Sequence, residues 1–318
     1  MTDSRHSSPP DNSLRYRADL LRHIRRFMDD RGILEVETPV MVSAPVTDPA
    51  IESFVVSTSA YKNTNQNQYY LQTSPEYAMK RMLVDGSGHI YQIARVFRQD
   101  ETGPWHNPEF TMLEWYRPGF DQFQLMDEID ELLVSLGLVA SQRNTYQEIF
   151  LKITGIDPIT ANEDQLNSFA TSHGLASKLT DHSDLLDFIF SHNIADALSH
   201  EPPTLIHSFP NSQAALAQIN PDGVTAARFE LFIHGIEIAN GFQELTDAKE
   251  QRSRFQQDNS RRRAKGLVEN AIDEKFLNAL ESGLPECSGV ALGIDRLLMV
   301  LHGFNHIKDV IRFTTDAI

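Results

Sequence analysis

The chain has 318 residues, 41% of them hydrophobic and 9% aromatic, enough for a full core in one large or two ordinary domains. Its 44 acidic and 28 basic residues give a formal net charge of -16, which disfavours long-range attraction to a nucleic-acid backbone. The sequence has no apolar run of about 18 residues, and its polar start lacks the apolar core of a signal peptide; we therefore expect no membrane association and a cytoplasmic location.

Two compositional features have simple interpretations. The single cysteine, Cys287, excludes an internal disulfide and a multi-cysteine zinc site, and its Pro-Glu-Cys-Ser-Gly context favours a structural role. The one dense basic cluster, Arg261 to Arg263 with Lys265, follows a helical pattern from about Ala248. We interpret it as a solvated helix end, with a docking patch for a partner as the alternative.

The first half of the chain begins with a disordered tail, residues 1–13, followed by an amphipathic helix. The helix is indicated by apolar residues at helical spacing and ends at Gly32, the apolar positions being Leu14, Ala18, Leu21 and Met28. The next segment, ILEVETPV, predicts a strand broken by Pro39. Further strands are expected at 69–72, 89–97 and 110–116, and a helix at 121–138 with one apolar face formed by Phe123, Met126, Ile129, Leu133 and Leu136.

The second half contains a mostly helical insertion, about 141–203, between two parts of a sheet. The strand TLIHSFP follows, and RFELFIHGIEIANGFQEL predicts a hairpin that turns at His234-Gly235. The segment CSGVALGIDRLLMVLHG reads as a strand running into a helix. Strands cluster without a βαβ rhythm, which indicates an α+β fold with an antiparallel sheet flanked by helices.

The stretch FRQDETGPWHNPEFTMLEWY joins two expected strands by a loop of polar groups that could wrap a ligand. The planar guanidinium of Arg98 suits an α-phosphate, and His106 could meet outer phosphates. Pro108 restricts Asn107, whose backbone could then read a base edge, and Phe110 offers a face for stacking. The alternative is an ordinary hairpin with a surface ion pair.

The predicted hairpin carries two glutamates that suit a divalent cation. A two-residue turn sets Phe232 opposite Glu237 and Ala239 opposite Glu230, so that both carboxylates point from one face. With bound phosphates, such oxygens suit Mg²⁺, although strand glutamates are more often solvent-facing.

Three further polar or aromatic residues, Asn240, Phe242 and Glu244, alternate on one face of the same strand, but with a parity that differs from that of Glu237. If all five line one cleft, a β-bulge is required near Ala239 to Gly241, where Gly241 would permit it. Farther on, Gly289 to Arg296 places an arginine at a helix start behind a glycine, where a nucleotide could approach; an ion-paired arginine is the structural alternative.

Three segments, taken in chain order, resemble the catalytic domain of class II aminoacyl-tRNA synthetases. Arg31 to Pro39 resembles motif 1, which builds the dimer interface in that family and implies a homodimer. Phe97 to Asp100 with HNPEF resembles motif 2, and Gly289 to Arg296 resembles motif 3. Within the class, HNPEFTMLEWY and EIANGFQEL are similar to the lysine-site segments of lysyl-tRNA synthetases.

The resemblance implies ATP and Mg²⁺ as cofactors and assigns a role to each matching residue. The catalytic residues would be Arg98 and Arg296, and Glu230 and Glu237 would hold Mg²⁺. The ATP site would also include Asp100, His106, Asn107, Phe110, Glu237, Ile238 and Gly293. The pocket for a lysine-type substrate would consist of Ser74, Glu76, Glu114, Tyr116, Asn240, Phe242, Glu244 and Ala291. Three glutamates there supply the negative charge that a buried ammonium needs.

Departures from the family pattern shape the expected function. Only about 30 residues precede motif 1, so we expect no anticodon-binding barrel. The chain instead resembles the short paralogs of lysyl-tRNA synthetase that join (R)-β-lysine to a lysine of translation elongation factor P. Ala291 stands where the lysyl enzymes have glycine, either to discriminate lysine isomers or as a neutral packing change. Asp100 stands where motif 2 usually has glutamate, so Glu101 could replace it.

The expected reaction is therefore a two-step, AMP-forming ligation through an aminoacyl adenylate, with elongation factor P as the acceptor and no tRNA. One alternative is a truncated enzyme that charges tRNA. Another is a regulatory paralog without catalysis, although a binding-only descendant need not retain Arg98, Glu230, Glu237 and Arg296. Amide synthesis on a free small acid is a third, poorly served by three glutamates.

Overall fold

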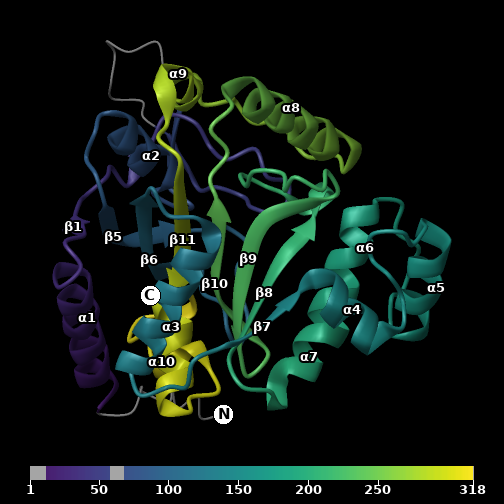
Figure 1. Cartoon of the computed structure of the whole chain (residues 1–318), viewed down its shortest axis with the longest axis horizontal. Coiled ribbons are helices and arrows are strands. Elements are labelled where there is room, and N and C mark those ends of the chain that lie inside the picture. The colour runs from purple at the N-terminus through teal and green to yellow at the C-terminus, as the bar shows by residue number, and fades with distance from the viewer. Residues whose placement is uncertain (1–11, 58–67, 318) are drawn as a thin grey trace, which may run out of the picture. The chain divides into compact units, whose positions relative to one another are not determined.

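The computed structural model describes residues 12–57 and 68–317. Residues 1–11 of the predicted tail lie outside this description, and the first helix starts at Ser13. The chain divides into two compact units. Figure 1 shows the whole chain, coloured by residue number. The first comprises 1–118, 246–285 and 291–318, and the second comprises 119–245 and 286–290. A single catalytic domain over 14–318 remains a prediction.

The first unit contains part of the main sheet, a small sheet and five long helices of the described chain. Its helices are α1 (Ser13–Asp29), α2 (Glu76–Val84), α8 (Ala248–Ala264), α9 (Glu274–Gly283) and α10 (Ile294–His302). In the main sheet β1 (Leu34–Glu35) pairs in parallel with β5 (Ile90–Phe97), and β5 pairs antiparallel with β6 (Glu109–Pro118). The small sheet has the order β2 (Met41–Val42), β4 (Gln68–Leu71), β3 (Val55–Ser57).

The second unit combines an antiparallel hairpin system with a helical subdomain. Strands follow in the order β7 (Gln142–Thr145), β8 (Thr204–Pro210), β9 (Thr225–Ile233) and β10 (Ile236–Gln243), with β7 and β8 parallel. Helix α3 (Gln122–Ser135) contacts β9 and β10. The predicted insertion contains α4 (Tyr146–Thr154), α5 (Glu163–Ser172), α6 (His182–Ile189) and α7 (Ala195–Ala197); Figure 1 shows this group beside β7 and β8.

Strand β11 (Cys287–Gly293) belongs to both units along the chain, since Cys287–Val290 lie in the second and Ala291–Gly293 in the first. It is the neighbour of β10 in the second unit and of β6 in the first. The sheet and the helices around it confirm the predicted α+β fold class. The parallel pairs β1–β5 and β7–β8 make the sheet mixed rather than wholly antiparallel.

Several helix boundaries have local causes in the sequence. Asp121 caps α3 by accepting from the backbone N–H of Gln124, whose side chain accepts in return from the Asp121 N–H. Thr145 and Glu148 form the same capping box at α4. Gly155 ends α4 with φ 72°, the left-handed conformation that glycine adopts without strain.

The buried face of α1 differs from the prediction. Its core residues are Leu20, Ile24, Phe27 and Met28, whereas Leu14 is 59% exposed. The predicted stripe mixed two faces, because Leu14, Ala18 and Leu21 repeat at helical spacing on the side away from the core. The predicted strand ILEVETPV is likewise reduced to Leu34–Glu35, because it pairs with β5 only there.

The basic cluster at the end of α8 is largely absorbed by the fold. Arg262 is only 1% exposed; its Nη2 lies 2.7 Å from Glu52 Oε2, and its Nε donates to the Val268 carbonyl at 2.7 Å. The neighbouring Arg263 is 69% exposed and pairs with Glu269. The cluster is therefore neither wholly solvated nor a continuous basic patch. Cys287 is buried, in agreement with a structural role.

Candidate active site

The loop between β5 and β6 carries the first group of predicted residues. The Arg98 backbone N–H donates to the Pro108 carbonyl, which closes the loop at its base. Arg98 Nη1 lies 3.6 Å from Glu101 Oε1, and His106 Nε2 lies 3.2 Å from Glu101 Oε2. Glu101, not Asp100, therefore faces Arg98 in the free protein, and both phosphate-binding candidates converge on one carboxylate.

The residues predicted to bind the base come where this loop ends: Asn107 is in the loop, and Phe110 is at the start of β6. The Asn107 side chain is 6% exposed and held at both ends: its Nδ2 donates to the Glu109 carbonyl at 2.6 Å, and its Oδ1 accepts from the Thr315 N–H at 3.1 Å. A side chain held in this way leaves only the Asn107 backbone for a ligand. Arg98 lies 5.2 Å from the Phe110 ring centre, within cation–π range. Arg98, expected to bind a phosphate, is thus adjacent to Phe110, expected to stack on the base.

The third motif reaches the same loop through the start of α10. Gly293 precedes the helix, and Arg296 Nε donates to the Trp105 carbonyl at 3.3 Å. Asp295, 2% exposed, accepts from the Thr111 backbone N–H at 2.7 Å and also contacts Arg17. The hydrogen bond from Thr111 joins the start of α10 to β6, and the ion pair with Arg17 joins it to α1. The sequence interpretation did not anticipate these two contacts, which fix the helix start that carries Arg296.

Four predicted pocket residues form one hydrogen-bonded cluster in the first unit. Ser74 Oγ donates to Glu114 Oε2 at 2.8 Å and accepts from the Glu76 N–H at 3.0 Å. Tyr116 OH donates to Glu114 Oε1 at 2.6 Å, as the alternation along β6 predicts. Lys80, which the sequence interpretation missed, lies 2.6 Å from Glu76 Oε1.

Glu114 is the most perturbed carboxyl group of this cluster. Burial, with the nearby charge of Glu76, raises its pKa from 4.5 to about 7, while hydrogen bonds from Tyr116 and Ser74 and the charge of Lys80 oppose the rise. A bound ammonium would favour the ionised form. The cluster is therefore suited to a cationic ligand, and its charge depends on pH near neutrality.

In the second unit, the β9–β10 hairpin turns at His234-Gly235, as predicted, with positive φ at both residues. Glu237 pairs with Phe232 as expected, but a register shift between Glu237 and Ala239 places Asn240, not Ala239, opposite Glu230. The predicted bulge is thus confirmed one or two residues earlier than expected. It moves Glu237 to the face that carries Glu230, Asn240 and Phe242.

The reason for Gly241 differs from the prediction. A Cβ at this position would lie 2.2 Å from Phe229 Cζ and 2.8 Å from the Gly289 carbonyl oxygen. The glycine therefore allows close approach of β11 and the Phe229 ring rather than the bulge.

The two glutamates of this face suit Mg²⁺ in part. Glu230 is 7% exposed; burial and the charge of Glu237 raise its pKa to about 7, opposed by Arg228, which contacts it directly. Within residues 12–57 and 68–317 no three His, Cys, Asp or Glu side chains gather as a metal site. Two hard oxygen donors without a third fit a cation completed by phosphate oxygens and water, the usual mode for Mg²⁺.

Of the remaining pocket candidates of the second unit, Glu244 is buried, and Asn240 and Phe242 are partly buried. Asn240 Oδ1 lies buried with no hydrogen-bond partner among the described residues, which leaves an acceptor for a donor from a ligand. Phe242 packs against a cluster of Ala214, Ala217 and Ala226. Glu244 is 1% exposed, and its backbone N–H donates to the Cys287 carbonyl. Ile238 is buried beside Glu237.

Ala291, of the first unit, is partly buried against a cluster that contains Ala94, Val96, Met112 and Phe110. Its methyl group thus touches the cluster on which the proposed base platform rests.

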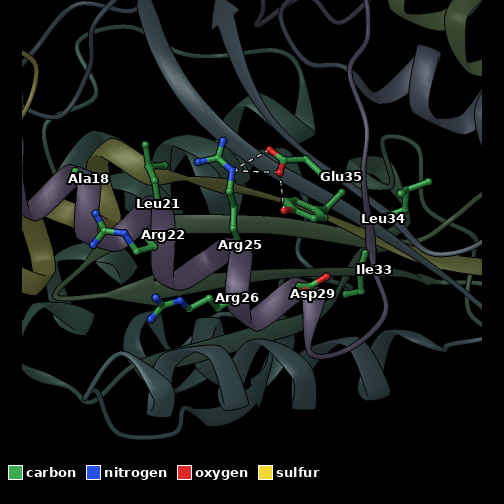
Figure 2. A pocket seen from close by; sticks show the side chains of 10 residues that line it. Ala18, Leu21, Arg22, Arg25, Arg26, Asp29, Ile33, Leu34 and Glu35 are labelled. Carbon is green, nitrogen blue, oxygen red and sulfur yellow. Dashed lines mark hydrogen bonds and ion pairs between the residues drawn. The ribbon is translucent and has the colours of Figure 1, made fainter.

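A hollow of about 700 Å³ lies away from these residues in the first unit, beside α1 and β1. Figure 2 shows Arg25 directed at Glu35, with Arg25 Nε 3.1 Å from both carboxylate oxygens. Tyr91 OH donates to Glu35 Oε2 at 2.9 Å. Leu34, 58% exposed, also lines the hollow. These residues belong to or adjoin the segment that resembles motif 1.

Comparison with known proteins agrees with the arrangement. The sequence matches the class II tRNA synthetases (D, K and N) over residues 3–317, and the chain belongs to this family. None of the described helices has the length and apolar character needed to cross a membrane.

The curated relatives narrow the comparison. The chain is 49% identical to an elongation factor P (R)-β-lysine ligase from Proteus mirabilis, over 93% of each chain. It is 47% identical to the ligase of that name from Salmonella typhi over 94% of each chain, and 46% identical to that from Hamiltonella defensa over 97% of each.

Proposed function

We propose that this chain is an ATP-dependent ligase that activates (R)-β-lysine and transfers it to the ε-amine of a lysine on translation elongation factor P. The observation that carries the proposal is the match to ligases of that name over 93 to 97% of both chains. The buried cluster around Glu114, suited to an ammonium group, supports the same substrate class.

We assign the nucleotide to the residues of motifs 2 and 3 and to the hairpin glutamates. Arg98 and Arg296 would stabilise the charge that develops on the α-phosphate, and the Asn107 backbone and the Phe110 ring would hold the base. His106 would meet the γ-phosphate. Glu101 replaces Asp100 in this assignment, because Glu101 is the carboxylate that faces Arg98 and His106.

Glu230 and Glu237 would hold Mg²⁺, which when bound neutralises phosphate charge and assists departure of pyrophosphate. Arg228, two residues before Glu230 on the same face of β9, forms an ion pair with this carboxylate.

In the first step, a carboxylate oxygen of the substrate attacks the α-phosphorus, the bond to the β-phosphate oxygen breaks, and pyrophosphate leaves. In the second, the neutral ε-amine of the acceptor lysine attacks the adenylate carbonyl. The carbon–oxygen bond to AMP breaks, an amide forms, and the amine proton is released. The protein supplies positioning and fixed charge, with no covalent intermediate on a side chain.

Intact-mass analysis tests this proposal directly. Elongation factor P and a lysine tRNA are incubated in parallel with the enzyme, Mg-ATP and either α-lysine or (R)-β-lysine. We expect one added lysyl mass on the protein, formed faster with the β isomer. A mass gain on the tRNA with the protein unchanged would show a tRNA-charging enzyme, and no pyrophosphate exchange with any lysine isomer would indicate a regulatory paralog.

Ala291 is the proposed determinant of isomer preference. Ala291→Gly should shift the ratio of kcat/KM for (R)-β-lysine over α-lysine toward α-lysine by roughly 10- to 200-fold, the range for one methyl group in a tight pocket. Ala94→Gly removes a methyl from the same apolar cluster and serves as the control. An unchanged ratio in Ala291→Gly identifies the methyl as neutral packing.

We also propose a homodimer formed through α1 and β1. Leu34, exposed at the hollow, and Leu14, exposed elsewhere on α1, support this assignment, since exposed large apolar side chains are typical of an interface. Native mass spectrometry of the wild type and of Leu34→Glu tests it, and an unchanged dimer in the variant would place the interface elsewhere.

A further inference from the structure

Lys80 is a lysine buried in the second turn of α2, with no solvent-exposed surface. Lysine is almost never fully buried unless it is paired. Its Nζ lies 2.6 Å from Glu76 Oε1, one helical turn earlier in the chain. Glu76 is itself only 15% exposed, so the ion pair is shielded from water and from salt.

The Lys80–Glu76 ion pair lies beside buried aromatic rings. Phe276 of α9 is fully buried, and Lys80 Nζ lies 5.8 Å from its ring centre. Tyr77 stacks on Phe276 with ring centres 4.4 Å apart and planes within 5°. Packing of α2 on α9 therefore prevents the ammonium from swinging toward solvent and directs it to Glu76.

Lys80 also acts on the second carboxyl group of the cluster. The charged groups facing Glu114 are Glu76 and Lys80 from α2, with the Tyr116 hydroxyl of β6 beside it. Glu76 raises the Glu114 pKa, and Lys80 lowers it. A fixed cation favours the ionised form of a nearby carboxyl group, and Lys80 acts on Glu114 in this direction.

We propose that Lys80 is a positioning residue for the amino-acid substrate: it holds the Glu76 carboxylate in one rotamer and offsets one of the two carboxylate charges of the Glu76–Glu114 pair, which leaves one net negative charge for a single substrate ammonium. Two carboxylates and one resident cation sum to this charge. The inference rests on the proposed function, because it gives the cluster a lysine-type ligand. Lys80 touches no reacting atom in this assignment.

The first test is Lys80→Met, assayed by ATP–pyrophosphate exchange with (R)-β-lysine. We expect the KM for the amino acid to rise about tenfold or more while the KM for ATP is unchanged, since one partner of a buried pair is left unmatched. Arg81→Met removes an exposed cation from the next position of α2 and should leave both KM values unchanged. Equal KM values for wild type and Lys80→Met would overturn the inference.

A double-mutant cycle separates positioning from general support of the fold. In a Glu76→Gln background, adding Lys80→Met should raise the amino-acid KM by clearly less than in the wild type, because the contact with the Glu76 carboxylate is already lost and only the charge of Lys80 near Glu114 is removed. This neutral pair also folds more readily than Lys80→Met alone, so the comparison survives if the single variant is unstable. A further tenfold rise in the double variant would show a role independent of Glu76.

The titration of Glu114 gives a readout that needs no turnover. Carbon-13 NMR of labelled glutamate should show a higher Glu114 pKa in Lys80→Met than in the wild type, because the nearby positive charge is gone. An unchanged pKa contradicts the inference even if the KM rises. Failure of the wild type to exchange pyrophosphate with any lysine isomer would instead reject the proposed function, and the NMR comparison would still decide the role of Lys80.

Discussion

At the scale of one residue, the ionised form of Glu114 favours binding of an ammonium group but lowers the stability of the folded protein. The fold leaves its carboxyl group 2% exposed and raises the pKa from 4.5 to about 7. Between these values the native protein holds a proton that the unfolded chain has already released. The free energy of unfolding therefore falls as pH rises from 4.5 toward 7, and the charged form needed to bind an ammonium destabilises the free protein.

Glu114→Gln should remove this dependence. We expect the melting temperature of the variant, relative to wild type, to increase from pH 5 to about pH 7 and to level off above that value, while pyrophosphate exchange is lost. Loss of one hydrogen bond from Ser74 or Tyr116 lowers the stability of the variant by about 1 kcal/mol at every pH, so the trend rather than the offset is diagnostic. Glu109→Gln, on the same strand but 44% exposed, is the matched control for replacing a carboxyl group by an amide. A constant difference across pH would exclude a raised pKa for Glu114.

At the scale of the element, the β9–β10 hairpin shows how one extra residue determines a site. Simple alternation would put Glu237 and Asn240 on opposite faces. The register shift after Glu237 places both on the face of Glu230. The turn residues and the need for a bulge could be predicted from the sequence, but the register could not, because it depends on pairing along the whole hairpin.

Gly241→Ala should disrupt this element. The added Cβ would meet the Phe229 ring and the Gly289 carbonyl oxygen, and the backbone oxygen cannot move without shifting β11. We expect a loss of about 1 to 3 kcal/mol in the free energy of unfolding, measured by urea denaturation. Gly223→Ala is a useful contrast, because a Cβ there meets nothing within 4 Å and its effect arises only from φ of 72°. Equal, small losses in both variants would rule out overpacking at Gly241.

At the scale of the whole molecule, the net charge of -16 opposes non-specific binding to RNA. The basic cluster of α8 does not compensate, because Arg262 is buried and Arg263 is paired. We expect lysine tRNA to bind weakly in a fluorescence-anisotropy titration at low salt and not measurably at physiological salt. A tight complex that persists at physiological salt would favour the tRNA-charging alternative.

The sequence by itself determined what depends on residues close along the chain or on motif order. This includes the three motifs, the α+β class and the His234-Gly235 turn. It also includes the two-residue spacing that puts Glu114 and Tyr116 on one face of a strand. Only the tertiary structure decided which face of α1 is buried, that Glu101 faces Arg98, and that Lys80 and Arg228 accompany the pocket and hairpin glutamates. The physical reason is that burial and ion pairing depend on which distant segments exclude water from a side chain, and local periodicity carries no information about those segments.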